Sequence, residues 1–380
     1  MRESGLVMRL SEEEEKFKSM GRRLSPDISR LQVGDPYFPT PEHICDAARE
    51  AMRQGYTHYV PGMGDKDLIE AICEDLNHEY GCSFNPEGVI ITNGAQEGIY
   101  FVCSTFLSPG DEIILFNPTY SYGANIRMVD AIPVKVPLSE DFRLDRDAVK
   151  KAITPKTRAI LFCNPNNPTG VSFTREDVEF LAKLALEHNL LLVSDEVYRK
   201  YYYDGTQHFS TSSILEAKDR TILLDSFSKS YAMAGWRIGY VATTPELAKP
   251  MFLVHRATLS CINWPTQRAA LAALKGPQDC VREMVSEFDR RRENIIKKLE
   301  EVEGFDCVIP NSAFYIFGRF DAEMKSADMV DYLLGKKVAV RSGTEFGSGG
   351  EGWIRLSYSG PLKDVNEGID RLALALNGLK

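Results

Sequence analysis

The sequence is poor in the features that mark membrane, nucleic-acid-binding and disulfide-rich proteins. No stretch approaches the roughly 18 apolar residues that a membrane-spanning helix requires. Lysine and arginine number 45 against 54 acidic residues, and no basic block is long enough to neutralise a row of phosphates. The eight cysteines are scattered, without a CxxC or a zinc-ligand spacing. We therefore expect no membrane, nucleic-acid or metal partner, and reduced thiols in the cytoplasm.

The N-terminal sequence also lacks a secretory signal, because the acidic run from Glu12 to Glu15 stands where an apolar stretch would be needed. The composition is that of an ordinary globular protein. Of 380 residues, 43% are hydrophobic and 26% are charged. This length is sufficient for more than one domain with a sizeable core.

Short β-branched runs alternate with helical patterns over much of the chain, which is typical of a mostly parallel sheet covered by helices on both faces. After Trp264 the pattern changes to long polar helices and two strand-like runs, so we expect an α/β chain with a large seven-stranded domain and a smaller α+β domain. The expected division is 1–45 for an N-terminal segment that joins the small domain, 46–275 for the large domain and 276–380 for the small domain. The seven strand-like runs are 89–92, 112–116, 132–136, 158–163, 190–194, 221–224 and 238–242, and the two later ones are 314–317 and 353–358.

Three local patterns predict helix boundaries. Thr40 followed by Pro41 predicts an N-cap and a first helical residue. The helical spacing of apolar residues over 65–80 ends at Gly81, which is placed as a C-terminal stop. Thr174 followed by Asp177 has the form of a capping box.

Polar residues follow several of the expected strands, at the edge where open α/β sheets bind ligands. The first strand ends at Thr92-Asn-Gly-Ala-Gln96, where a helix N-terminus could offer amide groups to an anion. Later strands lead into Asn164–Gly170, Asp195–Tyr198 and Ser226–Lys229, and Arg237 lies eight residues beyond Lys229. An acid, a lysine and an arginine at one edge suggest a site for a charged cofactor.

The motifs and their order along the chain resemble those of the class I and II aminotransferases, the fold type I family that uses pyridoxal 5'-phosphate (PLP). The similarity covers nearly the whole chain, from Leu31–Gly34 to Trp353–Tyr358. The resemblance implies that Lys229 binds the cofactor covalently and moves the Cα proton of the substrate. It also implies that Asp195 pairs with the pyridine nitrogen of PLP.

The remaining site residues are implied by the same resemblance. Tyr198 and Asn167 correspond to the pair that hydrogen-bonds the phenolate oxygen of PLP, and Tyr120 to the aromatic ring that stacks on the cofactor. Arg355 corresponds to the arginine that grips the substrate α-carboxylate, with Gly34 and Asn167 beside it. The resemblance places the PLP phosphate at Ser226, Arg237 and the backbone amides of Gly94 and Ala95, with Gln96 next to them. It also implies that Tyr59 of the neighbouring subunit reaches this phosphate. The protein is therefore expected to be a homodimer with a shared active site.

The chain departs from the family pattern where dicarboxylate substrates are bound. Ala95 and Thr258 stand where some relatives have a lysine or an arginine. Arg256 and Arg341 lie near enough in sequence to substitute, although each is more easily interpreted as structural. We therefore expect an amino donor that is not strictly aspartate. Ser312 also replaces the usual glycine before Ala-Phe-Tyr.

The resulting hypothesis is an aminotransferase that moves an amino group from an L-amino acid to a 2-oxo acid by a ping-pong mechanism. A PLP-dependent lyase, cyclase or oxidase on the same fold is the alternative, because Lys229 and Asp195 would serve each of these reactions. A PLP-binding transcription regulator would need a DNA-binding domain, for which the roughly 30 residues before Gly34 are too few.

Two further motifs match short functional patterns but lack the sequence context that those functions require. The GxGxxG pattern at Gly347–Gly352 leaves too few residues for a dinucleotide-binding unit. The SxxK pattern at Ser226–Lys229 lacks the SDN and KTG motifs of penicillin-recognising hydrolases.

Overall fold

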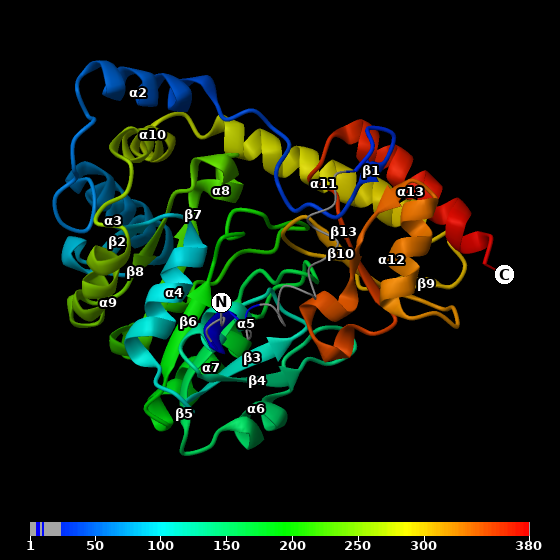
Figure 1. Cartoon of the computed structure of the whole chain (residues 1–380), viewed down its shortest axis with the longest axis horizontal. Coiled ribbons are helices and arrows are strands. Elements are labelled where there is room, and N and C mark those ends of the chain that lie inside the picture. Colours follow the sequence, from blue (N-terminus) through cyan, green and yellow to red (C-terminus); the bar gives the residue numbers. More distant parts are fainter. Residues whose placement is uncertain (1–4, 8–9, 11–23, 380) are drawn as a thin grey trace.

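The structure is a computed structural model that describes residues 5–7, 10 and 24–379. The first part of the expected N-terminal segment 1–45 therefore lies outside the described residues. The described residues form three sheets: a large one in the middle of the sequence, a four-stranded one near the C-terminus and a two-stranded one made by β1 (Ser29–Arg30) and β11 (Val338–Ala339) (Figure 1). None of the helices in the described ranges is long and apolar enough to cross a membrane.

The large sheet has seven strands, the number that the alternation of patterns predicts, and their order is β2-β8-β7-β6-β5-β3-β4. Every neighbouring pair is parallel except those of β8, which runs antiparallel to both β2 and β7. Consequently β2, β6 and β7 run in the same direction, and their carboxyl ends lie along one edge of the sheet. The strands are β2 (Val89–Thr92), β3 (Glu112–Asn117), β4 (Ile132–Pro137), β5 (Thr157–Cys163), β6 (Leu191–Asp195), β7 (Thr221–Ser226) and β8 (Gly239–Ala242).

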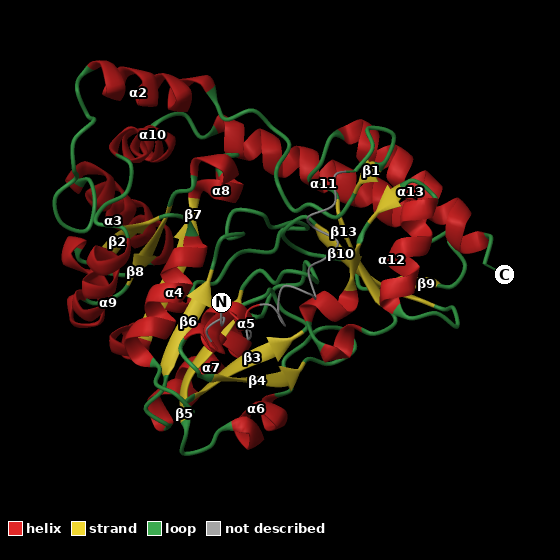
Figure 2. Ribbon diagram, viewed as in Figure 1, coloured by secondary structure: helices red, strands yellow, loops and turns green. Residues whose placement is uncertain are grey.

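Helices cover both faces of this sheet (Figure 2). Successive side chains of a strand point to opposite faces. Ile90 accordingly packs in the core that contains α4, whereas Val89 and Ile91 pack in the core that contains α3 and α10. The helices of this part are α2 (Glu42–Arg53), α3 (Lys66–Tyr80), α4 (Ala95–Phe106), α5 (Gly123–Met128), α6 (Arg146–Ala152), α7 (Arg175–Glu187), α8 (Phe227–Ser230), α9 (Pro245–Thr258) and α10 (Trp264–Lys275).

The smaller unit is built on a four-stranded antiparallel sheet in the order β12-β13-β10-β9. Near it, β1 (Ser29–Arg30) pairs in parallel with β11. The GxGxxG segment forms only a three-residue 3-10 helix (Ser348–Gly350) and is followed by the strand β13 rather than by an α-helix, so it lacks the geometry of a dinucleotide site. The elements are α11 (Asp279–Leu299), β9 (Phe305–Cys307), β10 (Tyr315–Phe320), α12 (Ser326–Gly335), β11 (Val338–Ala339), β12 (Arg341–Ser342), β13 (Trp353–Ser357) and α13 (Leu362–Asn377).

Two of the three helix-boundary predictions are confirmed. Helix α3 ends at Gly81, whose φ of 64° is accessible to glycine at little cost, and Thr174 forms a complete capping box with Asp177. The prediction for Thr40 is wrong, because α2 begins at Glu42 with Pro41 at the N-cap. The Thr40 hydroxyl instead donates to the carbonyl oxygen of Ala232 at 2.7 Å and accepts from Trp236 Nε1 at 2.9 Å.

Candidate active site

The polar residues that follow the parallel strands meet at one edge of the large sheet. Asp195 is the last residue of β6, and Ser226 is the last residue of β7. The Ser226 hydroxyl accepts a hydrogen bond from the amide of Ser228 at 3.3 Å, which caps the short helix α8 that carries Lys229. The acid and the lysine are thus placed by two adjacent strands.

The Lys229 amine lies in an environment that favours its neutral form. Burial lowers the pKa of Lys229 to about 8, and the positive charges of Arg355 and Arg237 lower it further against the opposing effect of Asp35. Its Nζ donates to the carbonyl oxygen of Gly34 at 2.7 Å. Near neutral pH a useful fraction of such an amine is unprotonated, as a nucleophile or a general base requires.

Asp195 is a buried carboxylate that contacts neutral donors. Its Oδ2 accepts from the Tyr122 hydroxyl at 2.8 Å, and its Oδ1 accepts from the amide of Val197 at 3.3 Å. Burial raises the pKa of Asp195 to about 7. Within the described part of the chain no cationic side chain lies within 4 Å of it. A cationic group such as a protonated ring nitrogen would stabilise the charged form of this carboxylate.

A second group of residues forms an anion-binding corner at the start of α4. Gly94 has φ 80°, and a Cβ at this position would lie 2.6 Å from Nη2 of Arg237. The exposed Arg237 guanidinium donates to the carbonyl oxygens of Ala234 at 2.9 Å and Asn93 at 3.4 Å, and no carboxylate of the described ranges pairs with it. The first-turn amides of a helix add a partial positive charge. The corner therefore fits a phosphate group.

Gln96 lies in the first turn of α4, but its side chain turns away toward α5. Its Nε2 donates to Oδ1 of Asn125 at 2.5 Å. Only its backbone amide is placed at the helix N-terminus, next to that of Ala95.

Arg355 is a buried guanidinium without a carboxylate partner among the described residues. It is 2% exposed, and burial lowers its pKa to about 10. Nη2 donates to the carbonyl oxygen of Gln32 at 2.6 Å, whereas Nε has no hydrogen-bond acceptor in the part of the chain that the structure describes. Leaving a buried charge unpaired is costly, so the site fits an incoming carboxylate.

A chain of hydrogen bonds connects Arg355 to two tyrosines. Arg355 Nη1 donates to Oδ1 of Asn167 at 3.0 Å, and Nδ2 of Asn167 donates to the Tyr198 hydroxyl at 3.3 Å. The hydroxyls of Tyr198 and Tyr315 lie 2.7 Å apart. The Arg355 guanidinium also lies over the Tyr315 ring, 4.5 Å from its centroid. The orientation of Arg355 is therefore fixed by residues from several distant segments.

The other predicted residues have distinct environments. Gly34 must remain without a side chain, because a Cβ there would lie 2.0 Å from the Tyr315 hydroxyl. Tyr120 is 37% exposed and makes an edge-to-face contact with Tyr122, the partner of Asp195, at 5.4 Å between ring centroids. Tyr59 is 85% exposed, so within one subunit its side chain lies at the surface rather than in this cluster of site residues.

The sequence reasoning missed Tyr122, Tyr315 and Gln32. Tyr315 belongs to the Ser312-Ala-Phe-Tyr segment, in which the sequence pattern singled out Ser312 alone. Tyr122 lies two residues after Tyr120 in an irregular segment, where no periodicity predicts burial. Gln32 acts through its backbone carbonyl, which leaves no residue-type signal in a sequence.

The departures from the family pattern can now be placed. Arg256 is exposed on α9, and the Thr258 hydroxyl bonds to the carbonyl oxygens of Val254 and His255 in the same helix. The Ser312 hydroxyl donates to the carbonyl oxygen of Gly170 at 2.8 Å. Arg341, in contrast, is buried next to Arg355.

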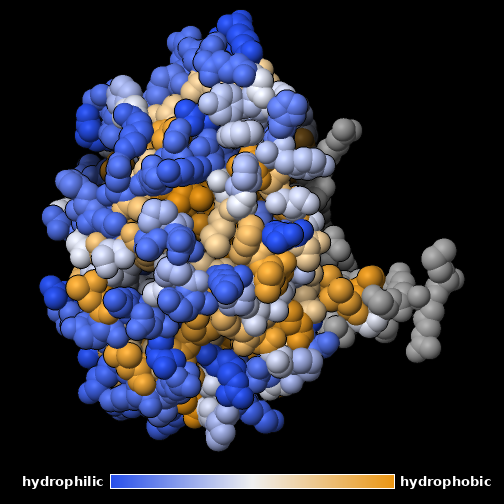
Figure 3. Space-filling model, turned by 90° about the vertical axis from the view of Figure 1, so that its left-hand side faces the viewer, coloured by the Kyte–Doolittle hydropathy of each residue, from blue (hydrophilic) through white to orange (hydrophobic). Residues whose placement is uncertain are grey.

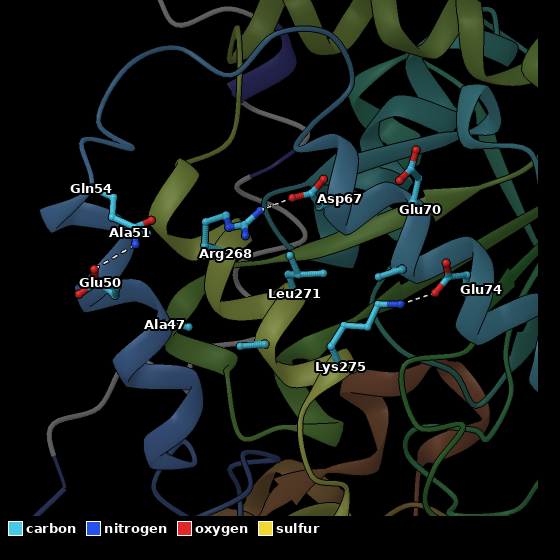
Figure 4. A pocket seen from close by; sticks show the side chains of 12 residues that line it. Ala47, Glu50, Ala51, Gln54, Asp67, Glu70, Glu74, Arg268, Leu271 and Lys275 are labelled. Carbon is cyan, nitrogen blue, oxygen red and sulfur yellow. Dashed lines mark hydrogen bonds and ion pairs between the residues drawn. The ribbon is translucent and has the colours of Figure 1, made fainter.

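A separate hollow of about 530 Å³ lies between α2, α3 and α10, away from the cluster (Figure 4). Its two cations are already paired, since Arg268 donates to Asp67 at 2.7 Å and Lys275 bonds to Glu74. It is open to solvent and contains none of the groups described above.

Comparison with known proteins places this chain in a family. The profile described as aminotransferase class I and II matches residues 26–372. An aromatic-amino-acid aminotransferase of Thermococcus litoralis is 37% identical, with 93% of this chain and 92% of the relative covered. An aspartate aminotransferase of Pyrococcus abyssi is 37% identical, with 93% of each chain covered.

Among solved structures, an aromatic aminotransferase from Pyrococcus horikoshii superposes with a TM-score of 0.91 at 36% identity. The match covers 98% of this chain and 99% of that one. The chain therefore belongs to the class I and II aminotransferases, a PLP-dependent family of enzymes.

Proposed function

We propose that this aminotransferase binds PLP at the carboxyl edge of the large sheet, with Lys229 and Asp195 as the central catalytic residues. One observation carries the proposal: a buried acid with no cationic side chain within 4 Å among the described residues and a buried amine with a lowered pKa follow adjacent strands. Asp195 would hold the ring nitrogen in its protonated form. PLP supplies an electron-accepting ring that stabilises negative charge at the substrate Cα.

The phosphate of PLP would be held by the corner at the start of α4. Gly94, Ala95 and Gln96 would contribute backbone amides, and Arg237 and Ser226 would contribute side chains. Tyr120 would stack on the ring, and Tyr198 and Asn167 would bond to its phenolate oxygen. These assignments are supported by the contact of Tyr120 with Tyr122 and by the hydrogen bond between Asn167 and Tyr198.

The residues of the chain divide the work of the reaction. Arg355 would bind the substrate α-carboxylate with its fork of donors, beside Gly34 and Asn167, and so orient the Cα–H bond. The Lys229 amine would take the proton from the substrate Cα and hold it for the later proton transfer that completes the exchange of the amino group. We propose a ping-pong reaction, in which the amino group stays on the enzyme after the first product leaves and a 2-oxo acid then accepts it.

The amino donor is proposed to extend beyond aspartate. Relatives of similar identity are named for aspartate and for aromatic amino acids. Neither Ala95 nor Thr258 supplies a cation for a side-chain carboxylate.

We further propose a homodimer with a shared active site, in which Tyr59 of one subunit reaches the phosphate of its partner. The proposal is supported by the exposure of Tyr59 itself at 85% and of other large apolar side chains, among them Met52 on α2 and Leu253 on α9 at 54% and 65%. Figure 3 shows apolar patches among polar side chains on the side of the molecule where α2, α3 and α9 lie. Mixing Tyr59→Phe with Lys229→Ala subunits should restore part of the activity lost in each, whereas unshared sites would restore none.

Two broader assignments remain proposals. All eight cysteines are free thiols, which supports a reducing compartment such as the cytoplasm. The domain division 1–45, 46–275 and 276–380 is supported by the pairing of β1 with β11.

The test of the reaction type is the visible spectrum of the PLP-loaded protein with single amino acids and no 2-oxo acid. Conversion to the pyridoxamine form, with one equivalent of 2-oxo acid released per site, would establish transamination and identify the donor. Release of ammonia without that conversion would instead support the lyase or oxidase alternative.

A further inference from the structure

A second buried arginine lies beside the one proposed to bind the α-carboxylate. Arg341 on β12 is directly opposite Arg355 on β13 in the antiparallel pair. Directly opposite residues project from the same face of a sheet, with Cβ atoms about 5 Å apart. Their guanidinium carbons lie 5.2 Å and 5.0 Å from the centroid of the same ring, that of Phe346. The two cations therefore share one wall of the site.

The two arginines differ in how their charge is balanced. Arg341 Nε donates to Oε2 of Glu345 at 2.7 Å, and Nη2 donates to the same oxygen. Both side chains of this pair are only 5% exposed. Arg355 has no carboxylate within 4 Å in the described part of the chain. The protein thus supplies an anion to one of the two adjacent guanidinium groups and leaves the other for a ligand.

The Arg341–Glu345 pair is also electrically part of the site. Burial raises the pKa of Tyr120, and the positive charges of Arg341 and Arg355 both oppose this rise. Burial lowers the pKa of Arg355, which the charge of Arg341 lowers further and that of Glu345 raises. A negatively charged group placed between Tyr120 and Arg355 would therefore experience Arg341 as well.

We propose that Arg341 is a second carboxylate-binding residue of the substrate site, and that Glu345 occupies it in place of the side-chain carboxylate of a dicarboxylic amino acid. This inference rests on the proposed function, with Arg355 on the α-carboxylate. An acidic substrate must compete with Glu345 for Arg341, whereas a neutral or aromatic substrate meets no such competition. The pair therefore sets the donor preference toward uncharged side chains.

The test is Glu345→Gln in the PLP-loaded enzyme. Without a 2-oxo acid the enzyme turns over once, and the second-order rate constant of this half-reaction is measured for L-aspartate, L-glutamate, L-alanine, L-phenylalanine and L-lysine. The ratio of acidic to neutral donors should rise about tenfold or more, because one charge-assisted hydrogen-bond partner becomes available to the substrate. The double variant Arg341→Gln/Glu345→Gln should return the ratio to the wild-type value or below it.

Two further variants serve as a fallback and as a matched control. Glu345→Asp keeps the buried charge and should shift the ratio in the same direction by a smaller factor, which covers a failure of Glu345→Gln to fold. Glu179→Gln removes one acid from the exposed Arg175–Glu179 pair, whose charged atoms lie 2.7 Å apart, and should leave the ratio unchanged.

An equal change for all donors would overturn the inference, because Glu345 would then only position its neighbours. A selective loss of activity with L-lysine would also overturn it, by assigning Glu345 to a substrate ammonium group. If the wild type converts no amino acid at all, the proposed function fails and this inference fails with it.

Discussion

The cofactor end and the substrate end of the site are built in different ways. At the cofactor end, Asp195, Ser226 and Lys229 follow two adjacent strands of one sheet. At the substrate end, Arg355 is held by Gln32 and Asn167, which are 323 and 188 residues away in sequence. The proposed cofactor residues are thus placed mainly by neighbouring strands of the large sheet, whereas the proposed substrate-binding arginine is placed by distant segments of the chain that pack together.

The two ends also differ in the charge that they leave unbalanced. Among the residues that the structure describes, the cofactor end contains a buried acid without a cationic partner, and the substrate end contains a buried guanidinium without a carboxylate partner. Each deficit matches the opposite charge of the group proposed to bind there. Substitutions at the cofactor end should therefore lower the rate of the chemical step, and those at the substrate end should weaken binding.

The largest effect is expected for Lys229→Ala. Loss of the group that moves the Cα proton should lower the single-turnover rate by about 10⁴-fold, because general acid–base catalysis contributes up to that factor. The exposed Lys150, 3.4 Å from Asp147, provides a control, since Lys150→Ala should leave the rate unchanged. A single-turnover rate of Lys229→Ala near that of the wild type would contradict the proposed catalytic role of Lys229.

Asp195→Asn should lower kcat by about 100-fold or more, because the buried charge opposite the proposed ring nitrogen is lost. The KM of the amino acid should change much less. Steady-state kinetics at saturating PLP measure both values. A change confined to KM would contradict the division of labour between the two ends.

Arg355→Lys should raise the KM of the amino donor by about 10- to 100-fold, because a lysine cannot replace both donors of the fork. A smaller change in kcat is expected. Arg292→Lys is the matched control, since Arg292 is also buried but pairs with Asp204 at 2.8 Å outside the site. Equal effects of the two variants would show that a general loss of packing, rather than carboxylate binding, is responsible.

The same Asp195→Asn substitution should stabilise the protein without cofactor. The pKa of Asp195 is raised from 3.8 to about 7, so the native state binds more protons than the unfolded state in this range. The free energy of unfolding of the wild type should therefore fall, relative to the variant, as the pH rises from about 4 to about 7. The expected difference at pH 8 is roughly 2–4 kcal/mol. Urea unfolding of both proteins across this range measures it, and a constant difference would contradict the prediction.

The smallest effect is expected for Tyr122→Phe, which removes one hydrogen bond from Asp195 while leaving the ring. The dissociation constant of PLP should rise about three- to tenfold, because a single hydrogen bond contributes about 1 kcal/mol. Tyr203→Phe is the control, since the Tyr203 hydroxyl bonds to the carbonyl oxygen of Ala313 rather than to a site residue. Unchanged PLP affinity for Tyr122→Phe would show that the bond does not support the cofactor end.

The cofactor end could be predicted from the sequence because its residues occur in short motifs at strand ends. The alternation of β-branched runs and helical patterns gave all seven strands of the large sheet to within two residues at each end. The rule that ligands bind where parallel strands end pointed to Asp195 and Lys229, and the family resemblance supplied the roles predicted for them. The placement needed no knowledge of how the rest of the chain packs.

The substrate end could be predicted only in part. Arg355 was found by resemblance, but its partners Gln32 and Tyr315 depend on contacts between segments that no local pattern encodes. Arg341 was considered by position, but its pairing with Glu345 depends on the turn that follows β12. The error at Thr40 has the same origin, because a tertiary hydrogen bond to Ala232 competed with the expected cap.

The most direct test of the account is the position of the covalent bond to PLP. The PLP-loaded protein is reduced with borohydride, digested and mapped by mass spectrometry. The account predicts the pyridoxyl group on Lys229 alone, next to the strand that ends at Ser226. A label on any other lysine, or none, would contradict the assignment of this edge of the sheet as the cofactor site.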